Sequence, residues 1–117
     1  MVKEKHRWVI IEVIGDELSK EELIKAINQK IYELFGTIYG SRVIYKLIEF
    51  DKSRGIGIIR VNLSALDMLR TVFLFLKEIN GKKMLINDLL VSGTLKALQT
   101  KLKKKETWDK VINREKL

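Results

Sequence analysis

The chain lacks cysteine and proline, and it has a single histidine, His6, among 117 residues. Without cysteine it forms no disulfide and offers no thiolate to a metal ion. A lone histidine also excludes the usual histidine clusters of zinc sites and the Ser-His-Asp arrangement of hydrolases. The absence of proline leaves the loops without a fixed φ and points to no particular function. Familiar metal and nucleophile chemistry is therefore not the basis of function.

Long hydrophobic runs are also missing, and no apolar stretch approaches the ~20 residues that cross a bilayer. The N-terminus joins a basic start to a short apolar run, but Glu12 interrupts that run and no small-residue cleavage site follows. We interpret the run as a β-strand. We therefore expect a cytoplasmic protein with no membrane partner.

Basic residues are in clear excess. The chain has 23 Lys and Arg against 15 Asp and Glu, a net charge of +8, while 46% of its residues are hydrophobic. This length and apolar content suit one domain with a real core. Net charge indicates the kind of binding partner and not the fold. Because this charge is positive, nucleic acid is the leading partner class and an anionic membrane surface is the second.

The first third of the chain predicts a strand and a helix. Residues 7–14 alternate between two faces in a β-branched run, which is typical of a strand. Ser19 and Glu22 have the spacing of a capping box, in which each side chain meets the other residue's backbone N–H. Apolar residues then recur every 3.6 positions as far as Gly36, which predicts the end of the helix there.

The remaining chain predicts three strands and two helices. In order these are a strand at 43–50, a hairpin loop at 51–55, a strand at 56–63, a helix from a cap pattern at Ser64 and Asp67 to residue 79, a turn at Asn80 and Gly81, a strand at 83–91 and a basic helix at 94–105. The order β-α-β-β-α-β is that of a ferredoxin-like α+β sandwich, as in RNA-recognition motifs, with an added helix. We predict one domain over residues 1–105 and a tail or short helix over 106–117.

Residues 54–61 fit the frame of the RNA-recognition octapeptide but lack its aromatics. Ile56 and Ile58 would occupy the positions where rings stack on bases, and isoleucine has no flat π surface. We therefore expect no conventional reading of single-stranded RNA by this sheet. The alternative interpretation is that Gly57 is an ordinary strand glycine and that the match arose by chance.

The open face of the predicted sheet is apolar. Trp8, Ile10, Ile56 and Ile58 together would form a patch too large to leave in water. The third helix or the tail around Trp108 would cover it and give a three-layer sandwich. A partner protein is the other candidate.

The second helix is apolar nearly all round, although a helix on one face of a sheet needs only one apolar stripe. Met68, Leu74 and Phe75 fall off the main stripe. Packing against the first helix would absorb part of this surplus. The rest predicts a protein interface.

The segment after the last strand suits an anion. Ser92, Gly93 and Thr94 form a corner whose backbone N–H groups would point at a ligand, and the two hydroxyl residues are at least helix caps. The predicted helix that follows is rich in lysine: Lys96, Lys101, Lys103, Lys104 and Lys105. A helix dipole explains two or three C-terminal lysines, but it does not explain five. The corner and these lysines predict a surface for an RNA phosphate backbone.

No constellation of catalytic residues is visible. The carboxylates Glu12, Asp67 and Asp88 form no recognisable acid/base pair from their spacing. Within an apolar strand, Asp88 is expected to be an edge or salt-bridged residue. We predict no active site and no metal held by the protein.

With these motifs in place, the chain resembles the family of small archaeal ribonuclease P proteins known as component 2. The matching segments are His6-Arg7-Trp8, Leu47-Ile48-Glu49-Phe50-Asp51, Gly57-Ile58-Ile59-Arg60-Val61, Leu66-Asp67 with Arg70, and Val91-Ser92-Gly93-Thr94 before a lysine-rich helix. Two departures concern loops. Leu90 stands where the family often has glycine, and Asn62 and Leu63 stand where a charged residue is expected.

The resemblance implies a ribonucleoprotein that removes 5′ leaders from precursor tRNA. In that family the RNA subunit does the chemistry with bound Mg²⁺, and the protein meets precursor tRNA only indirectly. The resemblance also implies a TIM-barrel-like protein partner in a heterotetramer with two copies of each. By analogy the corner and the lysines would contact the RNA, and the surplus apolar surface of the second helix would meet the protein.

Two other classes of function occur on the same predicted fold. A ferredoxin-like regulatory module would bind a small effector near a glycine-rich loop, and residues 36–40 are compatible with one. The net charge and the lysines would then have no role. A hydrolase of acylphosphatase type would need a glycine-rich anion loop with arginine after the first strand, where Gly15, Asp16 and Glu17 are acidic instead.

Overall fold

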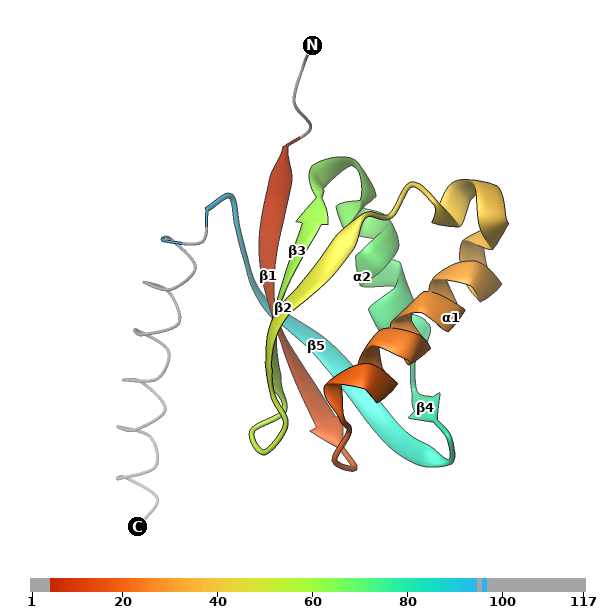
Figure 1. The fold of residues 1–117 in the computed structure, drawn as a ribbon, viewed down its shortest axis with the longest axis vertical. Helices are drawn as coiled ribbons and strands as arrows, with labels where there is room; N and C mark the ends of the chain where they lie inside the picture. Colours follow the sequence, from red (N-terminus) through yellow and green to blue (C-terminus); the bar gives the residue numbers. More distant parts are fainter. Residues whose placement is uncertain (1–4, 95, 97–117) are drawn as a thin grey trace.

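The structure is a computed structural model that describes residues 5–94 and 96. The elements are β1 (His6–Gly15), α1 (Lys20–Gly40), β2 (Tyr45–Asp51), β3 (Ile56–Asn62), a 3-10 turn η1 (Leu63–Ala65), α2 (Leu66–Phe75), β4 (Glu78–Ile79) and β5 (Lys82–Ser92). They form an α+β fold in which both helices lie on one face of a curled, antiparallel, five-stranded sheet of order β2-β3-β1-β5-β4 (Figure 1).

The four predicted strands are present, but the sheet departs from the standard ferredoxin-like arrangement. The short strand β4 pairs with the start of β5 and adds a fifth strand at the edge. The prediction of a helix through residue 79 is therefore wrong. Asn80 (φ 50°) and Gly81 (φ 80°) form a two-residue turn with both φ positive, which is the turn that joins paired strands. That turn draws the two residues before it into a hairpin.

α1 begins as predicted. Ser19 Oγ accepts a hydrogen bond from the Glu22 N–H at 3.1 Å, and Glu22 Oε1 accepts one from the Ser19 N–H at 3.2 Å. The helix does not end at Gly36, where the sequence predicted its end. Gly36 does leave helical geometry, at φ 73° and ψ −172°, but a further turn continues to Gly40. Gly36 is therefore a kink, and residues 36–40 form part of a helix and no glycine-rich loop.

The cap predicted for the second helix is wrong. The N-cap of α2 is Ala65, whose side chain cannot accept a hydrogen bond. Ser64 Oγ is instead an acceptor for Asn62 Nδ2 at 3.1 Å. Because the chain first makes a 3-10 turn at η1, the hydroxyl lies one residue too early to cap α2.

The main core lies between the sheet and the two helices. Ile11 and Ile59 from the sheet, Ile27 from α1, and Leu69 and Phe73 from α2 are almost fully buried there. A buried side chain of this size contributes about 1.5–3 kcal/mol. This two-layer packing sets the positions of all the strand ends.

A second, smaller cluster lies on the other face of the sheet. Ile10 and Ile58 are buried in it, and their partly buried neighbours are Trp8, Ile48, Ile56, Leu89 and Leu90. This confirms that Ile56 and Ile58 share the face on which RNA-recognition motifs carry aromatics. Leu90 packs in this cluster at the position where the family often has glycine.

The predicted basic helix at 94–105 and the tail at 106–117 lie outside the described residues, apart from Thr94 and Lys96. The element that covers the second cluster is therefore still a prediction. Within the described part of the chain, no helix is long and apolar enough to cross a membrane.

Candidate nucleic-acid interface

The predicted corner lies at the end of the sheet where β1 begins and β5 ends (Figure 1). Ser92 is the last residue of β5, pairs with Trp8 of β1 and is buried. Its Oγ accepts a long hydrogen bond of 3.4 Å from the Thr94 N–H. Gly93 and Thr94 are exposed. The strand pairing therefore anchors one side of the 92–94 corner, and the other side lies at the surface.

An arginine that the sequence did not assign to the site lies beside this corner. A Cβ atom on Gly93 would lie 3.8 Å from Nη1 of Arg7. That same Nη1 donates a hydrogen bond of 2.9 Å to the His6 carbonyl, which helps to orient the guanidinium. The contact depends on the pairing of β1 with β5, so residue spacing alone does not reveal it. Arginine presents several donors in a planar fork that suits phosphate.

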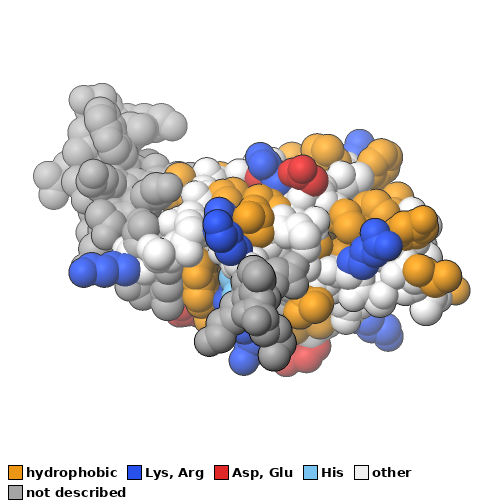
Figure 2. All heavy atoms as spheres, turned by 90° about the horizontal axis from the view of Figure 1, so that it is seen from above, with side chains coloured by type: hydrophobic (Ala, Val, Ile, Leu, Met, Phe, Trp, Pro, Cys, Tyr) orange, Lys and Arg blue, Asp and Glu red, His pale blue; other side chains and the backbone are white. Residues whose placement is uncertain are grey.

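Other basic residues surround the corner. Because neighbouring strands are antiparallel, the starts of β1 and β2 and the ends of β3 and β5 meet at this end of the sheet. The described basic residues there are Lys5, Arg7, Arg42, Lys46, Arg60 and Lys96. Figure 2 looks onto this end and shows basic side chains spread over it, with fewer acidic ones. We call these six residues and the 92–94 corner the basic end.

A buried amide holds the basic end together. The Asn62 side chain is 2% exposed and links β3 to the segment before β2. Its Oδ1 accepts from the Ile44 N–H at 2.9 Å, and its Nδ2 donates to the Arg42 carbonyl at 2.8 Å. These bonds satisfy two backbone groups that would otherwise be unpaired. Asn62 has this structural role at the position where the family resemblance led us to expect a charged residue.

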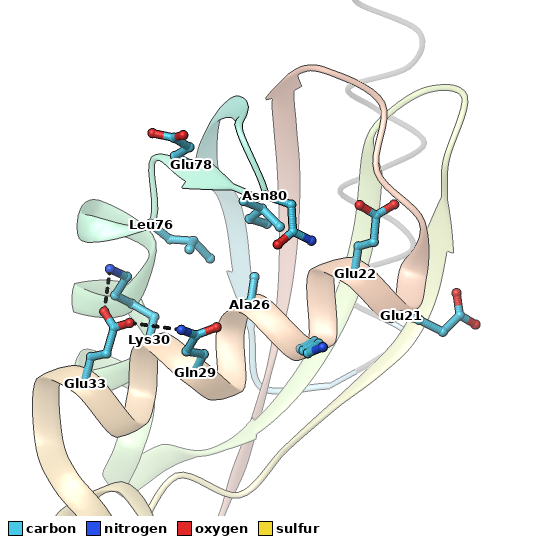
Figure 3. Close-up of a pocket in the computed structure, with 11 residues that line it drawn as sticks. Glu21, Glu22, Ala26, Gln29, Lys30, Glu33, Leu76, Glu78 and Asn80 are labelled. Atoms are coloured by element: carbon cyan, nitrogen blue, oxygen red, sulfur yellow. Dashed lines mark hydrogen bonds and ion pairs between the residues drawn. The ribbon is translucent and has the colours of Figure 1, made fainter.

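A separate groove of about 400 Å³ lies on the opposite side of the molecule, between α1 and the segment after α2 (Figure 3). Its apolar floor consists of the buried lining residues Ala26, Leu76 and Ile79. Polar and charged residues form its rim: Glu21, Glu22, Lys25, Gln29, Lys30, Glu33, Glu78 and Asn80. We call this feature the α1–α2 groove.

Two of the rim carboxylates are already paired. Lys82 Nζ lies 3.2 Å from Glu22 Oε2, and Lys30 Nζ lies 2.9 Å from Glu33 Oε2. The hydrogen bond from the Ser19 N–H, followed by the one from Lys82, lowers the pKa of Glu22. The hydrogen bond from Lys30 lowers the pKa of Glu33. Both carboxylates are thus held ionised. The rim residues Glu21, Lys25 and Glu78 form no ion pair among the described residues, so the groove offers a partner an apolar floor surrounded by charges of both signs.

The residues predicted for a protein interface separate into two groups. Leu74 and Phe75, at the end of α2, are 69% and 58% exposed, as the surplus apolar surface predicts. Met68 instead packs against the main core and is only partly exposed. Phe75 immediately precedes Leu76, which lines the α1–α2 groove.

The remaining sequence candidates have structural roles. Asp88 forms an ion pair of 2.7 Å with Arg70 Nε, which confirms it as a salt-bridged strand residue. Among the residues that the structure describes, no group of three or more His, Cys, Asp or Glu side chains is placed to hold a metal ion.

These features define a class of protein: a small α+β binding module with a basic end suited to a polyanion and a separate apolar-floored groove. Its fold matches a chain in the structure of yeast ribonuclease MRP, with a TM-score of 0.68 and 15% identity over 93% of this chain and 96% of that one. At this identity the likeness concerns the fold.

The sequence comparisons are more specific. The model of the Rpp14/Pop5 family matches residues 7–103, and the chain belongs to this family. Ribonuclease P protein component 2 of Pyrococcus horikoshii is 32% identical over 108 residues, covering 92% of this chain and 90% of that protein. The protein of the same name from Archaeoglobus fulgidus is 26% identical over 101 residues, covering 86% and 90%. The resemblance seen in the sequence is thereby confirmed.

Proposed function

We propose that this chain is a non-catalytic protein subunit of ribonuclease P that assists the catalytic RNA in removing 5′ leaders from precursor tRNA. Membership of the Rpp14/Pop5 family supports the assignment to ribonuclease P. The observation that carries the RNA-binding role is the 92–94 corner, with the Arg7 guanidinium on one side and exposed Lys96 following it. Cationic side chains beside an exposed glycine corner suit a phosphate.

The proposed mechanism is electrostatic. RNA phosphates repel one another when the catalytic fold is compact, and cations from the protein offset this repulsion. The RNA then keeps its active fold at a lower Mg²⁺ concentration. The Mg²⁺ ions belong to the RNA in this proposal, which gives the protein no cofactor of its own and no part in the chemical step.

The proposed RNA surface includes the 92–94 corner, Arg7 and Lys96, and it extends to four lysines outside the described residues: Lys101, Lys103, Lys104 and Lys105. Replacing these four with glutamine should flatten the slope of log affinity against log salt, by ~0.9 for each duplex phosphate that the protein no longer neutralises. An unchanged slope would place the RNA elsewhere on the protein.

We further propose a TIM-barrel-like protein subunit as partner, in a heterotetramer with two copies of each. Leu74 and Phe75 are large exposed apolar side chains at the end of α2, directly before Leu76 of the α1–α2 groove, and exposed apolar side chains that lie together mark protein interfaces. The groove and α2 would therefore face the protein, while the basic end faces the RNA.

Two finer points of organisation belong to the same proposal. We take the four long strands and two helices as a ferredoxin-like domain over residues 1–105, to which β4 is an addition, with a tail over 106–117. We also propose a cytoplasmic location, because the proposed substrate is a precursor tRNA.

The experiment is a Mg²⁺ titration of reconstituted cleavage. Ribonuclease P RNA and the other protein subunits are assayed on precursor tRNA with and without this chain. We expect the Mg²⁺ concentration for half-maximal cleavage to fall several-fold when the chain is present. If its omission changes neither this concentration nor the rate, the assignment is wrong.

The regulatory-module alternative has weaker support, because the proposed effector loop at residues 36–40 is a kinked helical end. Thermal melting with amino acids and nucleotides tests it, since a specific ligand would raise the melting temperature.

A further inference from the structure

Four residues from four strands form a row across the basic end. In the antiparallel register Ser92 of β5 pairs with Trp8 of β1, Trp8 pairs with Arg60 of β3, and Arg60 pairs with Lys46 of β2. Directly paired residues project to the same face of a sheet. Trp8 belongs to the cluster opposite the helices, so the whole row lies on that outer face. At about 4.8 Å between strands, the row spans roughly 14 Å.

The charges in this row are unusual. Lys46 and Arg60 are directly paired, exposed and of the same sign, an arrangement that destabilises a sheet. Within the described part of the chain neither forms an ion pair. The nearest acid on β2 is Glu49, which pairs with Ile58, one step further along the face. The two cations therefore stand together without internal compensation.

The surroundings of the Trp8 ring indicate which part of a nucleic acid the row would bind. The Arg60 guanidinium lies over it, 5.8 Å from the ring centroid, and the ring is itself partly buried in the outer-face cluster. The ring thus supports the arginine and is not open as a platform for a nucleobase. The row presents charge and hydrogen-bond donors at its surface, which fits phosphate and sugar better than bases.

We propose that Lys46 and Arg60 form a second RNA-phosphate site, continuous with the 92–94 corner through Trp8, so that the RNA backbone crosses β5, β1, β3 and β2. This inference rests on the proposed function and adds to it a path for the RNA across the end of the sheet. An acidic protein segment is the other polyanion that would suit two cations. The RNA is favoured because the row begins at the corner already assigned to phosphate.

The test compares three double variants of the full chain, reconstituted with ribonuclease P RNA and the partner protein. The row variant is Lys46→Gln with Arg60→Gln, and the corner variant is Arg7→Gln with Lys96→Gln. The control, Lys20→Gln with Lys52→Gln, removes the same charge from exposed positions at the other end of the sheet. RNA affinity is measured over a range of salt, together with affinity for the protein partner.

We expect the row variant to bind RNA about tenfold more weakly and to lower the salt slope by up to ~1.8, that is ~0.9 for each of two phosphates. The control should change RNA affinity less than about twofold, because its charges lie beyond roughly one Debye length of the site. The row variant removes a like-charge pair but also the contact of Arg60 with the Trp8 ring, so its melting temperature should stay close to that of the wild type. The arginine-to-lysine exchange Arg60→Lys should retain most of the affinity.

The outcomes separate the two proposals. If the corner variant weakens RNA binding and the row variant matches the control, the proposed phosphate site at Lys46 and Arg60 is wrong and the proposed function stands. If neither weakens it, the row and the phosphate-binding role of the 92–94 corner are both wrong, while the Mg²⁺ titration decides the proposed function separately. If the row variant loses the protein partner and keeps its RNA affinity and slope, the row is an interface for an acidic protein and the inference is overturned.

Discussion

The basic end and the α1–α2 groove differ in how their charges are satisfied. In the groove, Glu22 and Glu33 are paired with lysines, while the rim residues Glu21, Lys25 and Glu78 have no ion pair among the described residues, so charges of both signs surround the apolar floor. At the basic end, Arg60 and Lys46 stand together with no ion pair among the described residues. Mixed charge around an apolar floor suits a protein partner, and charge of one sign attracts a polyanion. This difference supports the proposal that the two surfaces bind two different partners.

The largest expected effect is a loss of affinity for the proposed protein partner, with RNA binding unchanged. Replacing Leu74 and Phe75 with serine should weaken binding of the TIM-barrel-like partner about a hundredfold, because apolar anchors at an interface often contribute about 2 kcal/mol or more. The free energy of unfolding should change by less than about 0.5 kcal/mol, since both side chains are exposed. Titration calorimetry with the partner and urea unfolding measure the two quantities.

The matched control is Ile14→Ser, which removes a similarly exposed apolar side chain at the end of β1. It should leave partner affinity unchanged. Equal losses of affinity in both variants would show that α2 is not the interface.

The next effect concerns the scaffold of the basic end. Asn62→Ala leaves the Ile44 N–H and the Arg42 carbonyl without their partner, which should cost about 2–3 kcal/mol of folding free energy. RNA affinity should fall as well, because Arg42 and Lys46 flank that link, while the groove keeps its partner. Urea unfolding and the two binding assays measure this. Glu17→Ala, at an exposed position between β1 and α1 and outside both surfaces, is the control, and a cost below about 0.5 kcal/mol for Asn62→Ala would contradict the role of the amide.

A smaller effect acts on the corner itself. Arg7→Gln with Lys96→Gln should weaken RNA binding about tenfold, or roughly 1.4 kcal/mol, and should flatten the salt slope. Binding of the protein partner should be unaffected. Fluorescence anisotropy with labelled RNA measures the affinity and the slope, against the Lys20→Gln and Lys52→Gln control. Loss of protein binding with normal RNA binding would reverse the assignment of the two surfaces.

The smallest effect lies between the two surfaces, where Tyr45 of β2 donates a hydrogen bond of 2.6 Å to Asn28 Oδ1 of α1. Tyr45→Phe should cost about 1 kcal/mol at pH 7. Burial raises the pKa of Tyr45 from 10.0 to about 12. The unfolded chain therefore loses this proton near pH 10 while the folded chain keeps it, so the stabilisation is fully present below pH 10 and is lost as pH rises toward 12.

The measurement is the difference in unfolding free energy between wild type and Tyr45→Phe across this range. Other titrating groups cancel in the difference. We expect it to shrink above pH 10 and to change sign before pH 12. A difference that stays constant would show that the hydroxyl is not buried in the folded chain.

Much of the fold could be predicted because its signals are local. The capping box at Ser19 and the alternation in β1 and β3 depend on residues close together in the chain, and the structure has them where the sequence indicated. The end of α2 could not be predicted from periodicity. Leu76 and Ile79 continue the helical apolar pattern, yet both are buried after the helix has ended, because the Asn80 and Gly81 turn pairs β4 with β5.

The candidate site combines local features with contacts between residues far apart in the chain. The 92–94 corner is one short segment, and its exposed glycine and threonine follow directly from the sequence. Arg7 and Arg60 join it only through strand pairing, which brings together residues far apart in the chain. Met68, which was predicted for the protein interface with Leu74 and Phe75, is partly buried and packs against the main core, a contact that helical periodicity alone does not reveal.

The most direct test of two partners on two surfaces is site-specific photocrosslinking in the assembled ribonucleoprotein. Benzoylphenylalanine is introduced at Thr94, in the basic end, or at Phe75, beside the α1–α2 groove. We predict that the Thr94 probe crosslinks to the RNA and the Phe75 probe to the protein subunit. A Thr94 probe that crosslinks only to protein, or a Phe75 probe that crosslinks only to RNA, would contradict this division of partners.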